Sequence, residues 1–366
     1  MPSQSSWNLY ASNKEAWEQM LIDCSAATES IDLEQFIFVT DDSGQKLIDI
    51  CVERAAAGVK IRFLWDAAGS FMFFGSNLAK DLKEKGIELL FWKTLVPNYY
   101  STPDYRSWYL RNHRRTLVID GKIGYTGSIC FQENKKNWRD TNVRLEGPVV
   151  ASMQRAFERM WARVTKRRPL PPPLKSRNSE FRYLTNYPAP GRRFLYSHII
   201  ESIRNADKFV YITTPYFTPT HTLLRAITQA ARRGVDVRIM LPERTDHYPI
   251  LDLAAQSYFT KLFEAGARVF LYAGNHGDSD NIIHGKTVVI DGKWATVGSL
   301  NFDSVSLLYT YEANIVSTNA TFAGELVSHF VHDMSLSTEV SHTEWRKRLF
   351  IQKIPEYLVK FIRRFL

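Results

Sequence analysis

The sequence has few cysteines and no apolar segment long enough to cross a membrane. Only Cys24, Cys51 and Cys130 occur in 366 residues, and their irregular spacing indicates neither a disulfide framework nor a zinc cluster. A reducing compartment is therefore expected. No uninterrupted apolar run approaches the roughly 18 residues that a spanning helix requires. Residues 1–20 lack the basic start and apolar core of a secretory leader, so any membrane contact is expected to be peripheral.

The chain is also short of negative charge. Its 47 Lys and Arg residues outnumber 38 Asp and Glu residues, which gives a formal charge of +9 and an isoelectric point near 9.3. A basic surface favours an anionic partner, either a nucleic acid or an acidic membrane, and charge alone does not choose between them. With 45% hydrophobic residues, the chain is long enough for two ordinary domains, each with its own core.

An internal repeat defines the organisation of the chain. The stretch RNHRRTLVIDGK at residues 111–122 returns as IIHGKTVVIDGK at residues 282–293. Each copy follows a matching series of elements, which begins with IDLEQFIFVTDD at 31–42 and with FVYITTPYFTPT at 209–220. Strand, helix, strand, helix and strand, followed by a hairpin, occur twice. This order predicts an α/β protein with two similar domains, each a mixed β-sheet flanked by helices, related by a pseudo-twofold axis.

A proline-rich stretch separates the two repeats. Residues 165–181, TKRRPLPPPLKSRNSEF, interrupt any regular pattern and place the boundary near Pro173, which gives domains 1–173 and 174–366. At the end of the second domain, residues 354–366 (IPEYLVKFIRRFL) have apolar side chains at helical spacing and basic side chains largely on the other face. Such a helix either packs on its domain or lies in a membrane interface.

The repeated motif brings a histidine and a cation together. The run after each histidine is apolar and rich in β-branched residues, and it ends in Asp-Gly, which predicts a strand followed by a tight hairpin turn. Side chains two positions apart on a strand share a face, so the histidine and the cation of each motif project toward one point. The candidate catalytic residues are the histidine, cation and aspartate of each motif: His113, Arg115, Asp120, His284, Lys286 and Asp291.

This set suits the chemistry of a phosphodiester. One neutral imidazole can attack phosphorus and form a covalent phosphohistidine, while the other, protonated, supplies a proton to the departing oxygen. The two cations would stabilise the negative charge that builds on the non-bridging oxygens. Such a mechanism requires no metal and no cofactor. For Asp120 and Asp291, formation of the turn is an equal alternative to a catalytic role.

Further polar residues recur at matched distances after the two histidines. Ser128 and Ser299 each lie 15 positions after theirs, and Asn301 lies two positions further on, so these three are candidate phosphate-binding donors. The position in the first half that corresponds to Asn301 is Cys130, a poorer donor.

Two carboxylates follow the histidines at longer matched distances. Asp140 lies 27 positions after His113, and Glu312 lies 28 positions after His284. A carboxylate bonded to the second ring nitrogen would fix the tautomer of each histidine and stabilise its charged form. Asp140 and Glu312 are therefore candidate histidine-orienting residues.

With these residues the chain resembles the phospholipase D superfamily, whose hallmark is two HxKxxxxD motifs at the junction of two similar domains. Three stretches are similar to the bacterial cardiolipin synthase branch: WRDTNVRLEGPVV at 138–150, TTPYFTP at 213–219 and GSLNFDSVSLLYTYEANIV at 298–316. The resemblance implies metal-independent transfer through phosphohistidine, with His113 usually taken as the nucleophile and His284 as the general acid. The chain departs from the family pattern at Arg115, where lysine is expected, and at Cys130, where asparagine is usual.

The expected function is therefore that of a phosphatidyltransferase of cardiolipin synthase type, which joins phosphatidylglycerol or a similar phospholipid to a glycerol-bearing lipid or alcohol. The alternatives are a phospholipase D hydrolase on the same lipids and a nuclease of the same superfamily, although no nucleic-acid module is recognisable. The aromatic stretches at 71–76 and 95–110 suit an anionic membrane surface. We thus expect a peripheral protein on the cytoplasmic side, which the resemblance implies to be that of a bacterial inner membrane.

Overall fold

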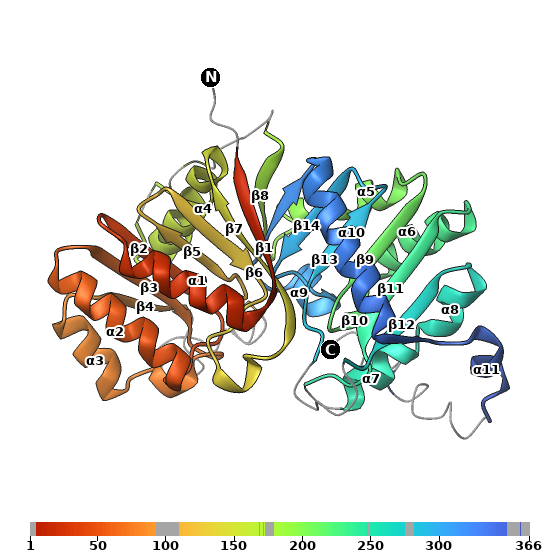
Figure 1. Cartoon of the computed structure of the whole chain (residues 1–366), viewed down its shortest axis with the longest axis horizontal. Coiled ribbons are helices and arrows are strands. Elements are labelled where there is room, and N and C mark those ends of the chain that lie inside the picture. Colours follow the sequence, from red (N-terminus) through yellow and green to blue (C-terminus); the bar gives the residue numbers. More distant parts are fainter. Residues whose placement is uncertain are drawn as a thin grey trace.

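The fold consists of two mixed β-sheets placed side by side, with helices packed against both (Figure 1). The structure, a computed structural model, describes residues 5–92, 110–167, 169, 170, 172, 179–246, 249–274, 282–349 and 359. The first half of the chain, red to yellow in Figure 1, forms one sheet, and the second half, green to blue, forms the other. This arrangement confirms the predicted fold class.

The first sheet has seven strands in the order β1-β7-β6-β5-β2-β3-β4. Strands β2, β3 and β4 are parallel, and β5 is antiparallel to β2. The strands are β1 (Ser6–Ser12), β2 (Ser30–Gln35), β3 (Lys60–Asp66), β4 (Glu88–Trp92), β5 (Thr116–Ile119), β6 (Ile123–Gly127) and β7 (Arg139–Glu146). The helices of this half are α1 (Asn13–Ser25), α2 (Asp42–Ala56), α3 (Asn77–Glu84) and α4 (Pro148–Val164), with short 3₁₀ turns η1 (Phe71–Phe73) and η3 (Glu133–Lys135).

The second sheet repeats this plan with eight strands in the order β17-β12-β11-β9-β13-β14-β16-β8. Strands β9, β11 and β12 are parallel, and β13 is antiparallel to β9. The strands are β8 (Phe181–Asn186), β9 (Phe209–Thr213), β11 (Asp236–Pro242), β12 (Arg268–Tyr272), β13 (Thr287–Ile290), β14 (Trp294–Gly298), β16 (Glu312–Ser317) and β17 (Ser337–Glu339), and β10 (Phe217–Thr218) pairs separately with β15 (Phe302–Asp303). The helices are α5 (Phe194–Arg204), α6 (His221–Arg232), α7 (Pro249–Gln256), α8 (Phe259–Glu264), α9 (Ser304–Leu308), α10 (Ala320–Ser335) and α11 (His342–Lys347).

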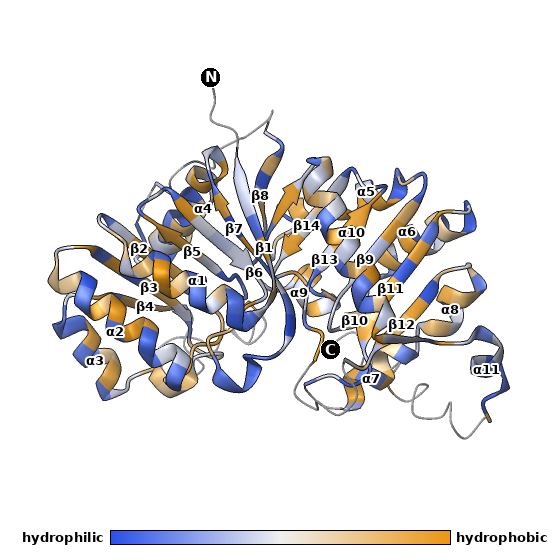
Figure 2. Ribbon diagram, viewed as in Figure 1, coloured by the Kyte–Doolittle hydropathy of each residue, from blue (hydrophilic) through white to orange (hydrophobic). Residues whose placement is uncertain are grey.

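A shared apolar layer joins the two sheets. Val118 and Val143 of the first half belong to the same buried cluster as Val289, Val297 and Ile315 of the second. Figure 2 shows strand β9 largely hydrophobic, while α1 to α3 alternate hydrophilic and hydrophobic residues. Each fully buried aliphatic side chain of this kind contributes about 1.5–3 kcal/mol. The two halves are therefore packed as one body.

The two Asp-Gly hairpins set the orientation of the motif strands. Asp120 and Gly121 have φ of 52° and 62°, and Asp291 and Gly292 have φ of 54° and 65°. Two successive left-handed residues form the turn type that Asp-Gly favours, so the predicted hairpins β5–β6 and β13–β14 are confirmed. Because β5 is antiparallel to β2, the start of β5 lies at the edge where the parallel strands end. The start of β13 lies at the equivalent edge of the second sheet.

Three parts of the sequence-based description remain predictions. The boundary at Pro173, the aromatic stretch up to residue 109 and, apart from Val359, the stretch 354–366 lie outside the described residues. Among the helices that the structure describes, none combines the length and the apolar character needed to cross a bilayer.

Candidate active site

The two histidine motifs meet where the sheets adjoin. His113 precedes β5 and His284 precedes β13. The residue before each histidine forms a parallel backbone bridge with the other half, to Tyr311 and Arg139 respectively. The amide of His113 donates to Tyr311 O at 3.0 Å, and the amide of His284 donates to Arg139 O at 2.8 Å. Each histidine is thereby held beside the other half's strand that carries a buried carboxylate.

Each imidazole is bonded to the carboxylate of the opposite half. His113 Nδ1 lies 2.9 Å from Glu312 Oε1, and His284 Nδ1 lies 3.1 Å from Asp140 Oδ2. Both carboxylates are fully buried. The regular spacing in the sequence relates each carboxylate to the histidine of its own half, whereas the structure exchanges the partners. Neither half alone contains a complete histidine–carboxylate pair.

Three hydroxyl groups hold Glu312 in place. Ser306 Oγ and Thr310 Oγ1 donate to its Oε1 at 2.9 and 2.7 Å, and Ser299 donates to its Oε2. A carboxylate that accepts this many hydrogen bonds has little freedom to rotate. Ser306 and Thr310 were not predicted from the sequence. They lie just before Glu312, but serine and threonine are too common at loop positions for their spacing to single them out.

Ser128 makes the matching contact to the other carboxylate. Its hydroxyl donates to Asp140, which also accepts from the backbone N–H of Thr141 at 2.8 Å. Both Ser128 and Ser299 thus direct their hydroxyl protons at carboxylates. The sequence-based prediction assigned these protons to a bound phosphate. Because a hydroxyl has one proton to donate, the contacts seen here favour a role in holding the carboxylates, and phosphate binding by the two serines stays a prediction.

Asn301 and Cys130, the third predicted donor and its counterpart, are both buried. Asn301 Nδ2 donates to Ser306 Oγ at 3.3 Å, while its Oδ1 has no hydrogen-bond partner among the described residues. In this orientation the side chain offers an acceptor, which suits a substrate hydroxyl better than a phosphate oxygen. Cys130 is 2% exposed and lies close enough to Lys286 to interact with it electrostatically.

The motif cations point at the second ring nitrogen of each histidine. Arg115 Nη2 lies 3.0 Å from His113 Nε2, and Lys286 Nζ lies 3.1 Å from His284 Nε2. A guanidinium only donates hydrogen bonds, so the Nε2 of His113 is the acceptor and its proton is on Nδ1, facing Glu312. This tautomer leaves a lone pair on the nitrogen next to the cation, as a nucleophilic imidazole requires.

Burial and mutual repulsion keep these groups short of positive charge. Burial and then the charge of Lys286 lower the pKa of His284 to about 3, against the opposing effect of Asp140. Burial also lowers the pKa of His113 against the effect of Glu312. The pKa of Lys286 falls to about 7, through burial and then through the charge of Arg115. An anion bound between these groups would raise all three pKa values, so the centre is suited to a phosphate.

A pocket opens beside His113. It has apolar walls, including Phe36, Leu251 and Val305, and polar groups that include Asn301, a combination typical of small-molecule sites. The side chain of His113 is 13% exposed, against 5% for that of His284. Solvent and ligands therefore reach the first histidine more readily than the second.

The motif aspartates lie at the other end of the motif strands, away from the histidines. Asp120 accepts hydrogen bonds from the backbone N–H groups of Thr28, Glu29 and Ser30, at the start of β2. Asp291 accepts from the N–H groups of residues 207–209 at the start of β9. In the structure both aspartates tie a hairpin turn to the neighbouring strand, which favours the turn role, and their catalytic role stays a prediction.

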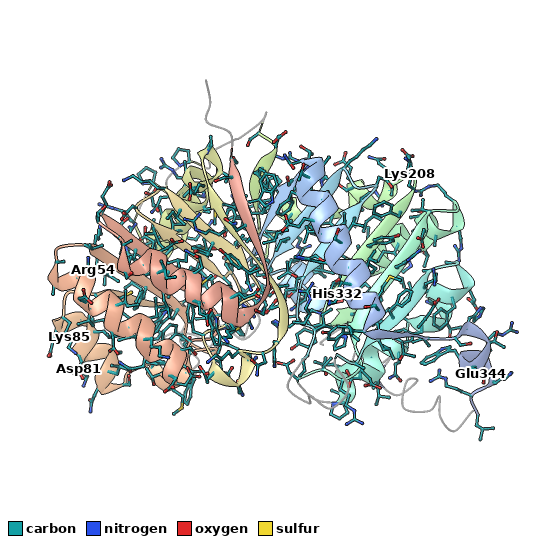
Figure 3. All side chains as sticks on the ribbon, viewed as in Figure 1. Arg54, Asp81, Lys85, Lys208, His332 and Glu344 are labelled. Carbon is teal, nitrogen blue, oxygen red and sulfur yellow. The ribbon has the colours of Figure 1, made fainter. Side chains whose placement is uncertain are left out.

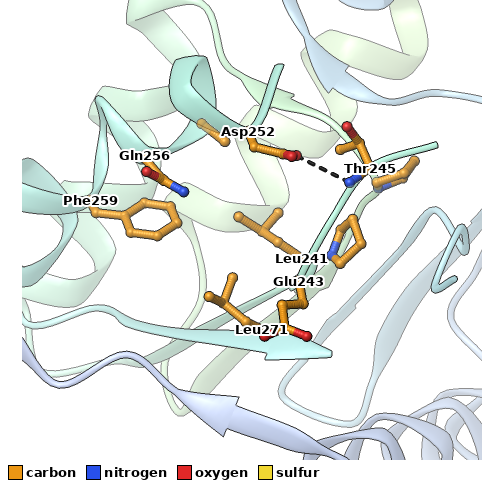
Figure 4. A pocket seen from close by; sticks show the side chains of 10 residues that line it. Leu241, Glu243, Thr245, Asp252, Gln256, Phe259 and Leu271 are labelled. Carbon is orange, nitrogen blue, oxygen red and sulfur yellow. Dashed lines mark hydrogen bonds between the residues drawn. The ribbon is translucent and has the colours of Figure 1, made fainter. Parts of the chain in front are cut away.

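A second, smaller pocket lies beside the ends of β11 and β12 (Figure 4). In it Thr245 N donates to Asp252 at 3.2 Å, next to Leu241 and Phe259. Neither His113 nor His284 lines this pocket.

Across the described ranges, no group of three or more His, Cys, Asp or Glu side chains is placed to hold a metal ion. Figure 3 shows that labelled charged residues such as Arg54 and Lys208 lie at the periphery, whereas many unlabelled side chains occupy the region between the sheets.

Comparison with known sequences identifies the family of the chain. The family described as cardiolipin synthase, PLD-like domain, matches residues 20–161 and 199–334. Cardiolipin synthase A of Proteus mirabilis is 32% identical over 355 residues, which cover 93% of this chain and 71% of that protein. The major cardiolipin synthase of Bacillus subtilis is 31% identical over 370 residues, which cover 95% of this chain and 73% of that protein.

Solved structures show the same fold at lower identity. The phosphatidylserine synthase of Haemophilus influenzae superposes with a TM-score of 0.72 at 15% identity, over 98% of this chain and 95% of that one. The polyphosphate kinase of Porphyromonas gingivalis gives 0.61 at 12% identity, over 99% of this chain and 53% of that one. These similarities concern the fold alone.

Proposed function

Since the chain belongs to the cardiolipin synthase family of the phospholipase D superfamily and is a phosphatidyltransferase of that superfamily, we propose that it moves the phosphatidyl group of phosphatidylglycerol to a second glycerol-bearing lipid. The products would be cardiolipin and glycerol. One observation carries the proposal: each of the two imidazoles has its Nδ1 on a buried carboxylate of the other half and its Nε2 beside a cation.

The first step would be attack by His113 Nε2 on the phosphorus of the donor. The bound phosphate raises the pKa of His284, so that its imidazole takes up a proton before the reaction. A P–N bond then forms, the P–O bond to the headgroup breaks, and the headgroup oxygen takes that proton from His284. In the second step the acceptor hydroxyl gives its proton to His284, attacks phosphorus and releases His113. Arg115 and Lys286 stabilise the charge on the non-bridging oxygens in both steps. The pocket beside His113 supports its assignment as the attacking residue.

The proposal is tested with vesicles of phosphatidylglycerol and the purified protein, with products resolved by mass spectrometry. Cardiolipin and glycerol in equal amounts are the expected result. Phosphatidic acid as the sole lipid product would replace the transferase with a hydrolase. No lipid product, together with cleavage of single-stranded DNA, would favour a nuclease.

Peripheral attachment to an anionic membrane is part of the same proposal, and exposed apolar side chains support it. Phe71, Met72 and Phe74, in and after η1, are 60%, 79% and 43% exposed. They follow the end of β3, at the edge of the sheet where the site lies. On the facing half, Phe194 and Tyr309 are also exposed, at 60% and 41%. Apolar groups beside a site on a protein of charge +9 suit an acidic lipid surface.

We expect the triple substitution Phe71→Ser, Met72→Ser and Phe74→Ser to weaken binding to phosphatidylglycerol vesicles by at least about tenfold, because burying each of these side chains contributes about 1.5–3 kcal/mol. Co-sedimentation measures the change. The matched control is Ile22→Ser, since Ile22 is also 60% exposed but lies near the end of α1, away from that edge. Equal binding of the triple variant and the wild type would remove η1 from the membrane contact.

A further inference from the structure

The ring of His284 is enclosed by two aromatic side chains, one from each half. The Trp138 ring lies 5.0 Å from it at 59°, and the Tyr216 ring lies 6.4 Å from it at 79°. Trp138 is 5% exposed. His113, by contrast, has the ring of Phe36 at 4.8 Å and borders the open pocket. The two histidines, which are equivalent by sequence, therefore differ in their access to solvent.

A charged pair connects these two aromatic rings. Lys135 Nζ lies 4.3 Å above the Trp138 ring and 3.3 Å from Asp246 Oδ2. Tyr216 donates from its hydroxyl to Asp246 Oδ1 at 2.5 Å. The four side chains thus form an arch over His284, with Lys135 and Trp138 from the first half and Asp246 and Tyr216 from the second.

Both charged members of this arch are largely removed from water. The side chains of Lys135 and Asp246 are each 9% exposed. Burying two charges costs free energy that their attraction only partly recovers. A buried ion pair of this kind therefore adds little to the stability of the fold. Lys135 interacts with the Trp138 ring and Asp246 with the Tyr216 hydroxyl, so the pair sets the position of the two rings that cover His284.

We propose that the arch of Lys135, Trp138, Asp246 and Tyr216 positions His284 and keeps bulk water away from it, so that an alcohol resolves the phosphohistidine. The inference rests on the proposed function and names what selects transfer over hydrolysis. In the resolving step the nucleophile's proton passes to His284 as the new P–O bond forms and the P–N bond to His113 breaks. Water in that place would give phosphatidic acid instead of a diester. Access to His284 therefore decides the product.

The test compares Lys135→Met and Asp246→Asn with the wild type on phosphatidylglycerol vesicles. Each substitution breaks the ion pair while nearly keeping side-chain volume, and we expect the ratio of phosphatidic acid to cardiolipin to rise about tenfold, equivalent to about 1.4 kcal/mol between the two barriers. The double variant should match the single ones, because the pair acts as a unit. The control is Arg268→Met, which breaks the Arg268–Glu339 pair, whose side chains are 42% and 41% exposed.

A second experiment measures the accessibility of the His284 imidazole in the absence of lipid. Diethyl pyrocarbonate acylates accessible neutral imidazoles, and peptide mass spectrometry gives a separate rate for each histidine. We expect His284 to react about tenfold faster in Lys135→Met than in the wild type, while the rate for His113 stays the same. A role in folding alone would not change one histidine selectively.

The outcomes separate this inference from the proposed function. A wild type that forms no cardiolipin overturns the proposed transfer, whatever the variants do. A wild type that forms cardiolipin, with variants that keep both its product ratio and its slow labelling of His284, overturns the arch alone. A lower total rate at an unchanged product ratio would likewise reduce the arch to a structural element.

Discussion

Replacing His113 with alanine should lower the rate of lipid turnover by at least about four orders of magnitude, because the covalent route then has no nucleophile. Replacing His284 with alanine should have a similar effect on natural phospholipids, for a different reason. A glycerol headgroup departs as a poor leaving group unless its oxygen is protonated. The two losses are equal in size with the natural substrate, so rates on phosphatidylglycerol alone do not assign the roles.

A donor with an acidic leaving group separates the two histidines. A phosphatidyl ester of p-nitrophenol needs no proton for departure, so the His284→Ala variant should still release nitrophenol once per site and retain phosphorus on His113. The His113→Ala variant should release none. Acid-labile, base-stable labelling of the denatured protein measures the intermediate. Labelling of His284 in the His113→Ala variant would reverse the assignment.

Asp120→Asn is the matched control within the same motif. Its carboxylate accepts backbone N–H groups at the start of β2, so loss of its charge should cost about 1–2 kcal/mol of stability and leave turnover within a few-fold of the wild type. A collapse of turnover in the folded Asp120→Asn variant would return this aspartate to the catalytic set.

The repeat made much of the fold predictable from sequence, because hydrophobic alternation and Asp-Gly turns act locally. The hairpins, their strands and the shared face of histidine and cation follow from period two and from the left-handed turn residues. The pairing of each histidine with the carboxylate of the other half does not follow from the sequence. It depends on the bridges to Tyr311 and Arg139, which form only when the halves are packed together, and spacing along one chain carries no information about that contact.

The contacts of the two serines and the arch over His284 could not be predicted from the sequence, for related reasons. Ser128 and Ser299 occur at equal distances after their histidines, which suggests a common ligand, and in the structure each donates to a carboxylate. Lys135 and Asp246 are far apart in sequence and have no counterpart in a motif. Their pairing is visible only once the two halves face each other.

The exchanged pairing predicts which catalytic step each carboxylate supports. Glu312→Gln places an amide, with its own N–H donors, against His113 Nδ1 and should force the other tautomer, as in serine proteases, where the comparable change costs about 10⁴ in rate. Nitrophenol release should therefore slow in Glu312→Gln. Asp140→Asn acts on His284, so it should slow turnover of phosphatidylglycerol strongly while leaving nitrophenol release nearly intact.

A pairing within each half would produce the reverse result. Asp140→Asn would then behave like His113→Ala, and Glu312→Gln like His284→Ala, so the two donors measured on two variants decide between the arrangements. The structure favours the exchanged result because both histidine–carboxylate contacts, at 2.9 and 3.1 Å, cross between the sheets. Catalysis would then require the assembled pair of halves, since each half supplies the group that holds the other's histidine in its reactive tautomer.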